Sequence, residues 1–302
     1  MGGAKKVLIT GASGLIGTRL TEMLLEKQYE VVHLGRGKKK GPVTSFTWDI
    51  GKGYIEPGTF TGVDVIVHLA GAGVGDERWS EKRKEDILLS RTRSTRLLYD
   101  ELKKGHHSVT TFVCASGIGY YGVEDNGKAS VETDKAGVDF LAEVTRQWEA
   151  EADRIGELMR VCKLRTGFVL SDRGGALPKL ALPVKWLVGA PLGPGSQYIN
   201  WIHIDDLCGI YIRMIEDTSL QGAYNGVAPG PVTNREITRA IASVMGKPLF
   251  FPAVPAFVLN IILGEMAYIV LKGGAASGEK IRSEGYAFKF TDLKQALSDL
   301  LK

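Results

Sequence analysis

The chain has 302 residues, enough for one large α/β unit or two modest domains. Its hydrophobic fraction of 44% and charged fraction of 24% are typical of a soluble globular protein. The net charge of +4 is mild, and no basic stripe with interleaved aromatic residues occurs. The sequence therefore argues against a nucleic-acid partner and suits a small anionic ligand.

The first predicted element is a buried parallel strand that starts at Lys6 and runs directly into a glycine-rich turn. The turn has the spacing Gly11-x-x-Gly14-x-x-Gly17, and an amphipathic run over 18–28 follows it. In such a turn the first glycine permits the tight bend, the second lets a pyrophosphate approach the backbone, and the third lets the helix pack closely on the sheet. Strand, turn and helix together predict a dinucleotide site, with a turn that binds no ligand as the alternative.

The next strand, over 30–34, indicates which dinucleotide is bound. An acidic residue at its end would bind the ribose 2′-hydroxyl of NAD, and an arginine there would accept the 2′-phosphate of NADP. The strand is followed by Gly35 and Arg36, and no carboxylate is present. NADP(H) is therefore the predicted cofactor, with Arg36 as the discriminating residue, and we expect the lysines at 38–40 to form a solvated basic loop.

Strands and helices then alternate along the chain, which predicts a Rossmann-type, doubly wound parallel sheet. The predicted strands cover 44–49, 63–71, 110–117 and 163–170, and the predicted helices cover 79–103 and 139–154. The strand over 63–71 ends in Leu69, Ala70 and Gly71, and small residues there leave room for a cofactor at the carboxyl edge of the sheet. Arg91 lies on the following helix, where it either reaches the cofactor phosphates or is a surface charge.

The cysteines indicate a reducing compartment. Cys114, Cys162 and Cys208 are odd in number and far apart, which fits neither a metal site nor a disulfide framework, so we expect free thiols. Because the first strand begins almost at the N-terminus, we expect a cytoplasmic protein with no signal or transit peptide.

Beyond residue 171 the pattern changes to loops and helices. A helix is predicted to about residue 216, a short strand over 224–228, and an amphipathic helix over 233–245 whose start has a capping box of Thr233 and Glu236. The apolar stretch over 257–271 is too short for comfortable membrane spanning and is predicted to be a buried helix or an interface helix.

This change of pattern divides the predicted chain in two. The first part is a dinucleotide-binding domain of residues 1–171, to which residues 203–228 return. The second is a smaller, mostly helical C-terminal lobe of residues 172–202 and 229–302 that we expect to contact the substrate.

These motifs together resemble the short-chain dehydrogenase/reductase superfamily in its extended or atypical branch. Within that branch the chain is similar to the epimerase family proteins, which are related to NAD(P)-dependent sugar-nucleotide epimerases. The likeness covers nearly the whole chain. It rests on residues 11–17, 35–36, 69–71, 78–84 and 90–91, and then on 116, 120–122, 201–207, 224–229 and 284–293.

The motifs and the resemblance together assign a set of cofactor contacts, and no metal site is predicted. The expected contacts are Gly11, Ser13, Gly14, Leu15, Ile16, Gly17, Gly35, Arg36, Leu69, Ala70, Gly71 and Arg91.

The resemblance also implies a catalytic Tyr-x-x-x-Lys pair on the helix after the serine-bearing strand, where the spacing puts both side chains on one helix face. That helix instead begins with residues 140–145, which include neither tyrosine nor lysine. Tyr99 and Lys103 have the spacing but precede the serine strand, and Tyr268 and Lys272 have it in the apolar stretch near the C-terminus. Neither pair is predicted to be catalytic.

Tyr121 and Ser116 are the candidates to replace the missing pair. Ser116 lies at a strand end and Tyr121 follows it, so we expect the tyrosine hydroxyl at the nicotinamide side of the cleft. The alternatives are a packed aromatic ring at Tyr121 and a serine at 116 that only satisfies backbone groups. Asn200 and His203 add polar side chains near the expected cleft.

Two classes of function follow from these residues. One is an NADP(H)-dependent oxidoreductase or epimerase that acts on an unidentified small carbonyl, alcohol or sugar-nucleotide substrate. The other is a non-catalytic NADP(H)-binding protein with a regulatory or interaction role, which the missing pair favours. A homo-oligomer is compatible with either, and no membrane partner is expected.

Overall fold

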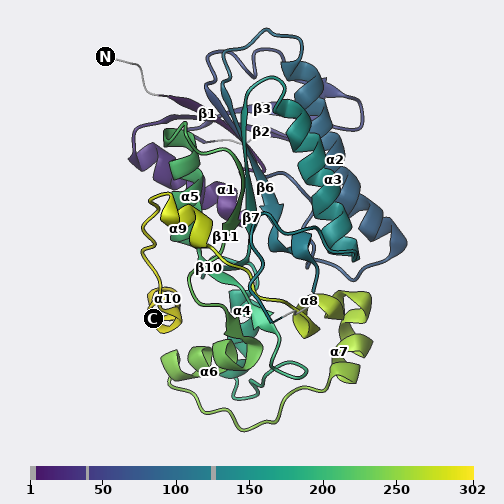
Figure 1. The fold of residues 1–302 in the computed structure, drawn as a ribbon, viewed down its shortest axis with the longest axis vertical. Helices are drawn as coiled ribbons and strands as arrows, with labels where there is room; N and C mark the ends of the chain where they lie inside the picture. Colours follow the sequence, from purple (N-terminus) through teal and green to yellow (C-terminus); the bar gives the residue numbers. More distant parts are fainter. Residues whose placement is uncertain (1–4, 39–40, 124–126) are drawn as a thin grey trace.

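The computed structural model describes residues 5–38, 41–123 and 127–302 (Figure 1). Its main sheet has eight strands in the order β11-β7-β6-β5-β1-β2-β3-β4. Their bounds are β1 (Lys6–Thr10), β2 (Glu30–Gly35), β3 (Thr44–Asp49), β4 (Tyr54–Ile55), β5 (Val65–His68), β6 (Thr111–Gly117), β7 (Arg160–Thr166) and β11 (Gly222–Gly226). Neighbouring strands are parallel except β3 and β4, which are antiparallel. The predicted Rossmann-type, doubly wound sheet is confirmed.

Helices cover both faces of this sheet (Figure 1). They are α2 (Glu81–Leu102) and α3 (Phe140–Ile155) on one face, and α1 (Leu15–Glu26) and α5 (Ile204–Glu216) on the other. Strand β1 shows why both faces are apolar, since successive side chains of a strand point to opposite sides. Val7 and Ile9 join the core beneath α1 and α5, and Leu8 joins the core beneath α2 and α3.

The C-terminal region is mostly helical, as predicted, and has a hydrophobic core of its own. Its helices are α4 (Leu177–Lys185), α6 (Asn234–Val244), α7 (Ala256–Leu263), α8 (Tyr268–Leu271), α9 (Glu279–Ser283) and α10 (Leu293–Leu301). Two small sheets pair β8 (Phe168–Leu170) with β10 (Trp201–His203), and β9 (Tyr198–Ile199) with β12 (Val232–Thr233). The predicted capping box is present at the start of α6. The division into two domains stays a prediction. Strand β11 lies within residues 203–228 and pairs with β7 in the main sheet.

The apolar stretch near the C-terminus is not a buried helix, so that part of the prediction is wrong. It forms α7, a 3-10 turn over Gly264–Ala267 and the short α8, because Gly264 ends α7 with a positive φ of 61°. Phe257, Ile261 and Ile262 on α7 are exposed. The alternative of an interface helix stays a prediction. Within the described ranges, no helix is long and apolar enough to cross a membrane.

Candidate functional site: a cleft at the carboxyl edge of the sheet

The glycine turn between β1 and α1 has the geometry that its sequence predicts. Gly11 has a φ of 64°, and a Cβ there would lie 2.8 Å from the carbonyl carbon of Leu69. A Cβ on Gly17 would lie 2.6 Å from the Cα of Ala12, so both positions exclude a side chain. No side chain caps the start of α1, whose N-cap is Gly14. The backbone N–H groups of the first helical turn and the positive end of the helix dipole are thus suited to an anion.

A cleft of about 650 Å³ extends from this turn along the carboxyl edge of the sheet to the C-terminal region. Many of the predicted cofactor residues line it. They are Gly11, Gly14, Leu15, Ile16, Gly17, Leu69, Gly71 and Arg91, joined by the catalytic candidates Ser116 and Tyr121. The structure therefore brings residues that follow β1 and β5, and residues of β6, α1 and α2, to one cavity.

Four predicted cofactor residues are not part of that lining. Ser13 lines a second cavity. Ala70 donates its backbone N–H to the hydroxyl of Thr10 at 3.2 Å. Gly35 is the last residue of β2, and the exposed Arg36 follows it. Their contact with a cofactor stays a prediction.

Arg91 is built into the wall of the cleft. Its Nη1 donates to the carbonyl oxygens of Ala72 and Ile87, at 2.9 Å each, and its guanidinium lies 5.1 Å from the ring centroid of Trp148. Burial, with a smaller effect from Arg83, lowers the pKa of Arg91 to about 10, so the side chain remains charged at neutral pH. Arg91 is thus not a surface charge, and its contact with the cofactor phosphates stays a prediction.

Trp148 is a cleft residue that the sequence analysis missed. Its side chain is 5% exposed and lines the cleft, and its indole N–H has no hydrogen-bond partner among the described residues. A buried donor left without an acceptor is costly, which makes this N–H a candidate contact for a bound ligand. Its spacing in the sequence could have indicated this position. Trp148 lies seven residues after Leu141 and four after Val144, so the three side chains share one face of the helix, and all three line the cleft.

The cleft-facing side of α3 is where the family's tyrosine and lysine are expected. It presents Leu141, Val144, Thr145 and Trp148 to the cavity. Neither a tyrosine nor a lysine therefore reaches the cleft from the described residues of this helix.

Tyr121 lies in a hydrogen-bond network at the end of the cleft near β7 and β11. Its hydroxyl donates to Oδ1 of Asn225 at 2.7 Å and accepts from Nη1 of Arg165 at 3.0 Å. Burial raises the pKa of Tyr121 to about 12, although the neighbouring Arg165 acts in the opposite direction. The tyrosine is therefore protonated at neutral pH and is suited to give a proton rather than to take one.

Ser116, near the end of β6, belongs to a buried ionic cluster with Glu149 and Arg165. Its hydroxyl donates to Oε1 of Glu149 at 2.7 Å, and Glu149 receives two further hydrogen bonds of 2.8 Å from Arg165. Burial opposes ionisation of Glu149, but the bonds from Arg165 and Ser116, with the charge of Lys163, lower its pKa overall. The serine hydroxyl is thus committed to a carboxylate and not to backbone groups.

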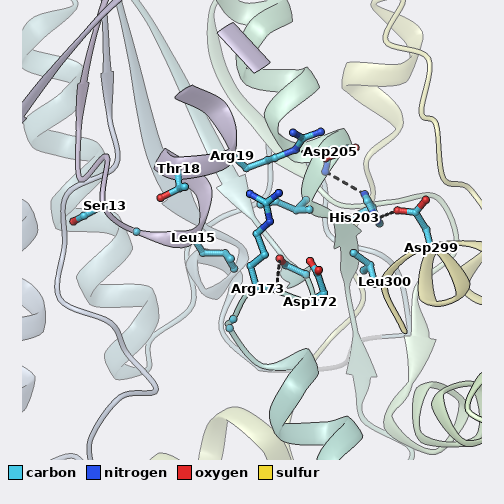
Figure 2. A pocket seen from close by; sticks show the side chains of 15 residues that line it. Ser13, Leu15, Thr18, Arg19, Asp172, Arg173, His203, Asp205, Asp299 and Leu300 are labelled. Atoms are coloured by element: carbon cyan, nitrogen blue, oxygen red, sulfur yellow. Dashed lines mark hydrogen bonds and ion pairs between the residues drawn. The ribbon is translucent and has the colours of Figure 1, made fainter. Parts of the chain in front are cut away.

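His203 is not among the residues that line this cleft. It lines the second cavity, of about 530 Å³, whose lining also includes Ser13, Leu15 and Thr18 (Figure 2). There its Nδ1 accepts the backbone N–H of Asp205 and caps α5, its ring packs on Phe290, and its Nε2 lies 3.3 Å from Asp299. Asn200 does line the cleft, with its amide bonded to Gly274 and Ala276.

Comparison with known proteins shows where the chain belongs. Residues 7–143 match the NAD dependent epimerase/dehydratase family, and residues 254–300 match a domain of unknown function, DUF1731. The chain is 32% identical over 299 residues to the epimerase family protein SDR39U1 of Mus musculus, covering 98% of this chain and 99% of that protein. It is also 32% identical over 298 residues to the epimerase family protein YfhF of Bacillus subtilis, with 98% and 97% covered.

The chain belongs to the epimerase family. Solved structures agree with this assignment. The human epimerase family protein SDR39U1 (isoform 2), solved with NADPH, superposes with a TM-score of 0.88 at 31% identity and covers 98% of both chains. The nucleoside-diphosphate sugar epimerase of Corynebacterium glutamicum superposes with a TM-score of 0.79 at 33% identity, covering 99% of this chain and 58% of that one. The family resemblance inferred from the motifs is thus confirmed.

The two stray tyrosine–lysine pairs have different positions in this epimerase family chain. Tyr99 is buried between α2 and α3, where its hydroxyl donates to Glu157 at 3.3 Å. Tyr268 and Lys272, in the C-terminal domain of unknown function, both line the cleft. This approach could not be predicted, because the pair lies at least 251 residues after the glycine turn.

Proposed function

We propose that this protein binds NADP(H) in the cleft and reduces or oxidises a small carbonyl, alcohol or sugar-nucleotide substrate, as an epimerase-like oxidoreductase. The glycine turn would hold the pyrophosphate, and Arg91 and Trp148 would contribute to the wall beside it. Arg36 would contact the 2′-phosphate. The NADPH in the similar human structure supports this choice of cofactor.

The observation that carries the proposal is Tyr121, which lines the cleft with a charged guanidinium at hydrogen-bond distance. The cofactor supplies the hydride chemistry. In the reductive direction Tyr121 gives its hydroxyl proton to the substrate oxygen, so the O–H bond of the tyrosine breaks and a substrate hydroxyl forms. Arg165 then stabilises the tyrosinate through the bond that it already makes, and water returns the proton. The cation of Arg165 would thus replace the absent lysine.

Replacing Tyr121 with phenylalanine tests the proposal, with Tyr120→Phe as the matched control because Tyr120 is adjacent but is not part of the cleft lining. NADPH oxidation is followed against a panel of ketones, aldehydes and nucleotide sugars. We expect Tyr121→Phe to reduce turnover by about 10²–10⁴-fold and to leave the NADPH dissociation constant within about threefold. Turnover that survives in Tyr121→Phe contradicts the role of Tyr121.

A second candidate function is a non-catalytic NADP(H)-binding protein. The observation that favours it is that Ser116 is committed to Glu149, while the cleft face of α3 lacks the family's pair. This alternative predicts tight NADPH binding and no NADPH oxidation across the whole panel. The free, buried thiols at positions 114, 162 and 208 fit a cytoplasmic location for either function.

A further inference from the structure

The charged side chains in the described lining of the cleft are all cationic. Its described lining includes two cations, Arg91 and Lys272, and neither aspartate nor glutamate. Arg91 is already bonded to Ala72 and Ile87 and packed on Trp148. Lys272 is exposed, and its ammonium makes no ion pair within the described part of the chain. The cleft therefore holds one cation without a partner, and no described carboxylate in the lining competes for it.

The backbone that carries Lys272 is held firmly against the cleft. Lys272 ends α8, with its N–H bonded to the carbonyl oxygen of Tyr268 at 3.2 Å. The next residue, Gly273, accepts the N–H of Tyr198 at 3.0 Å, and a Cβ on Gly273 would lie 2.5 Å from the Tyr198 oxygen. Asn200 fixes the following residues by donating to Gly274 at 2.8 Å and accepting from Ala276 at 2.7 Å. Four hydrogen bonds thus hold the backbone of residues 272–276, which carries Lys272, in place.

The lining of the cleft that contains Lys272 is mostly apolar. Phe168, Val169, Ile199 and Ile269 belong to this lining together with the hydroxyl-bearing Tyr198 and Tyr268, and the Asn200 amide is occupied by the backbone of the wall itself. One ammonium in apolar surroundings matches a ligand with one anionic group and an apolar body. The pyrophosphate of a nucleotide sugar carries two negative charges, whereas this lining has one cation, Lys272, that is not already bonded within the described residues.

We propose that Lys272 selects the substrate by binding its single anionic group, a carboxylate or a phosphate monoester, on a small and mainly apolar carbonyl compound or alcohol. This inference rests on the proposed function, because it names the substrate class of the same cleft. It also assigns a role to the C-terminal domain of unknown function, which supplies the specificity residue across from the glycine turn.

Equilibrium binding tests the inference without any turnover. The wild-type protein saturated with NADP⁺ is titrated by calorimetry with octanoate, octyl phosphate, 1-octanol and UDP-glucose. We expect octanoate or octyl phosphate to bind at least tenfold more tightly than 1-octanol and UDP-glucose, and the comparison of the two anions identifies the group that is recognised. Binding of UDP-glucose in preference to both anions, or no preference for either anion over 1-octanol, overturns the proposal.

Variants then locate the anion contact. Lys272→Gln should weaken the preferred anion by about 10- to 100-fold, the range of a lost charge-assisted hydrogen bond, and should remove the dependence of its affinity on sodium chloride. Lys272→Arg should restore most of the affinity. Lys247→Gln, at an exposed lysine outside the cleft lining, is the matched control and should change nothing.

The NADPH dissociation constant separates the possible failures. If Lys272→Gln weakens NADPH tenfold, Lys272 contacts the cofactor and the inference is wrong while the proposed function stands. If Lys272→Gln leaves both anions and NADPH unchanged, Lys272 is not a binding residue. Failure of the proposed function appears separately, as unchanged turnover in Tyr121→Phe.

Discussion

The buried pair of Glu149 and Arg165 supports both the fold and the position of Tyr121, and neutralising it should be costly. The side chains are 6% and 4% exposed, and two hydrogen bonds of 2.8 Å join them. Replacing Glu149 with glutamine keeps the shape of the side chain but removes the carboxylate that Arg165 contacts at 2.8 Å and Lys163 at 3.5 Å, and within the described residues no other carboxylate contacts both cations. Arg165 is then left in the interior without a counterion.

The magnitude follows from this burial. Removing one partner of a buried ion pair destabilises a protein by about 3–5 kcal/mol, because the remaining charge stays desolvated. Glu151 on the same helix is the matched control, since it pairs with Arg96 and Arg154 at 3.2 Å but is 21% exposed. Glu151→Gln should cost less than about 1 kcal/mol, as is usual for ion pairs that water can reach.

Urea unfolding followed by far-ultraviolet circular dichroism measures both losses, and their pH dependence gives a second check. The pKa of Glu149 is lowered in the folded protein, so its ionised form contributes stability above the ordinary carboxyl pKa. That contribution is lost as the pH falls through the folded-state pKa. The gap between wild type and Glu149→Gln should therefore be large at pH 7 and narrow in acid. Equal losses for Glu149→Gln and Glu151→Gln, or a gap that does not change with pH, would refute this reasoning.

Three further predictions concern the cleft. Arg36→Ala should weaken NADPH by about 10- to 100-fold and leave NADH nearly unchanged, because only the contact to the 2′-phosphate is lost; equal losses for both cofactors in fluorescence titrations would contradict it. Trp148→Phe removes the unpartnered indole N–H and also shrinks a buried ring, so it should lower stability as well as weaken NADPH by about 2- to 10-fold, whereas Trp186→Phe, at a site 69% exposed, should have no effect; unchanged NADPH affinity in Trp148→Phe would exclude the contact. Tyr99→Phe should leave NADPH binding and any turnover within about threefold, since its hydroxyl bonds to Glu157 and neither residue is part of the cleft lining. A large loss of turnover with an intact circular dichroism spectrum would make Tyr99 a functional residue.

The parts of the fold that the sequence predicted are those set by local rules. The strand before Gly11 and the glycines at 14 and 17 lie within a dozen positions of one another, so their spacing alone predicts the turn. The same holds for the capping box of Thr233 and Glu236, where the two partners are three residues apart. Element types followed from periodicity in the same way, and the bounds differ by a few residues.

The parts that could not be predicted depend on long-range packing. Glu149 and Arg165 are each unremarkable charged residues in the sequence, and only the packing of α3 on β7 buries them together. Lys272 reaches the cleft because the segment after α8 folds back onto Asn200, which lies 72 residues earlier in the chain. His203 was expected near the cleft and instead ends β10, which pairs with β8, and caps α5 at the second cavity.

The central claim is that NADPH occupies the cleft at the carboxyl edge of the sheet, and hydrogen–deuterium exchange with and without NADPH tests it most directly. Two sets of segments distinguish the two cavities, since residues 69–74 and 115–121 include lining of the cleft alone and residues 203–205 and 299–300 line the second cavity alone. We predict that NADPH slows exchange in the first set and leaves the second unchanged. Protection confined to the second set, or no protection at saturating NADPH, would contradict the account.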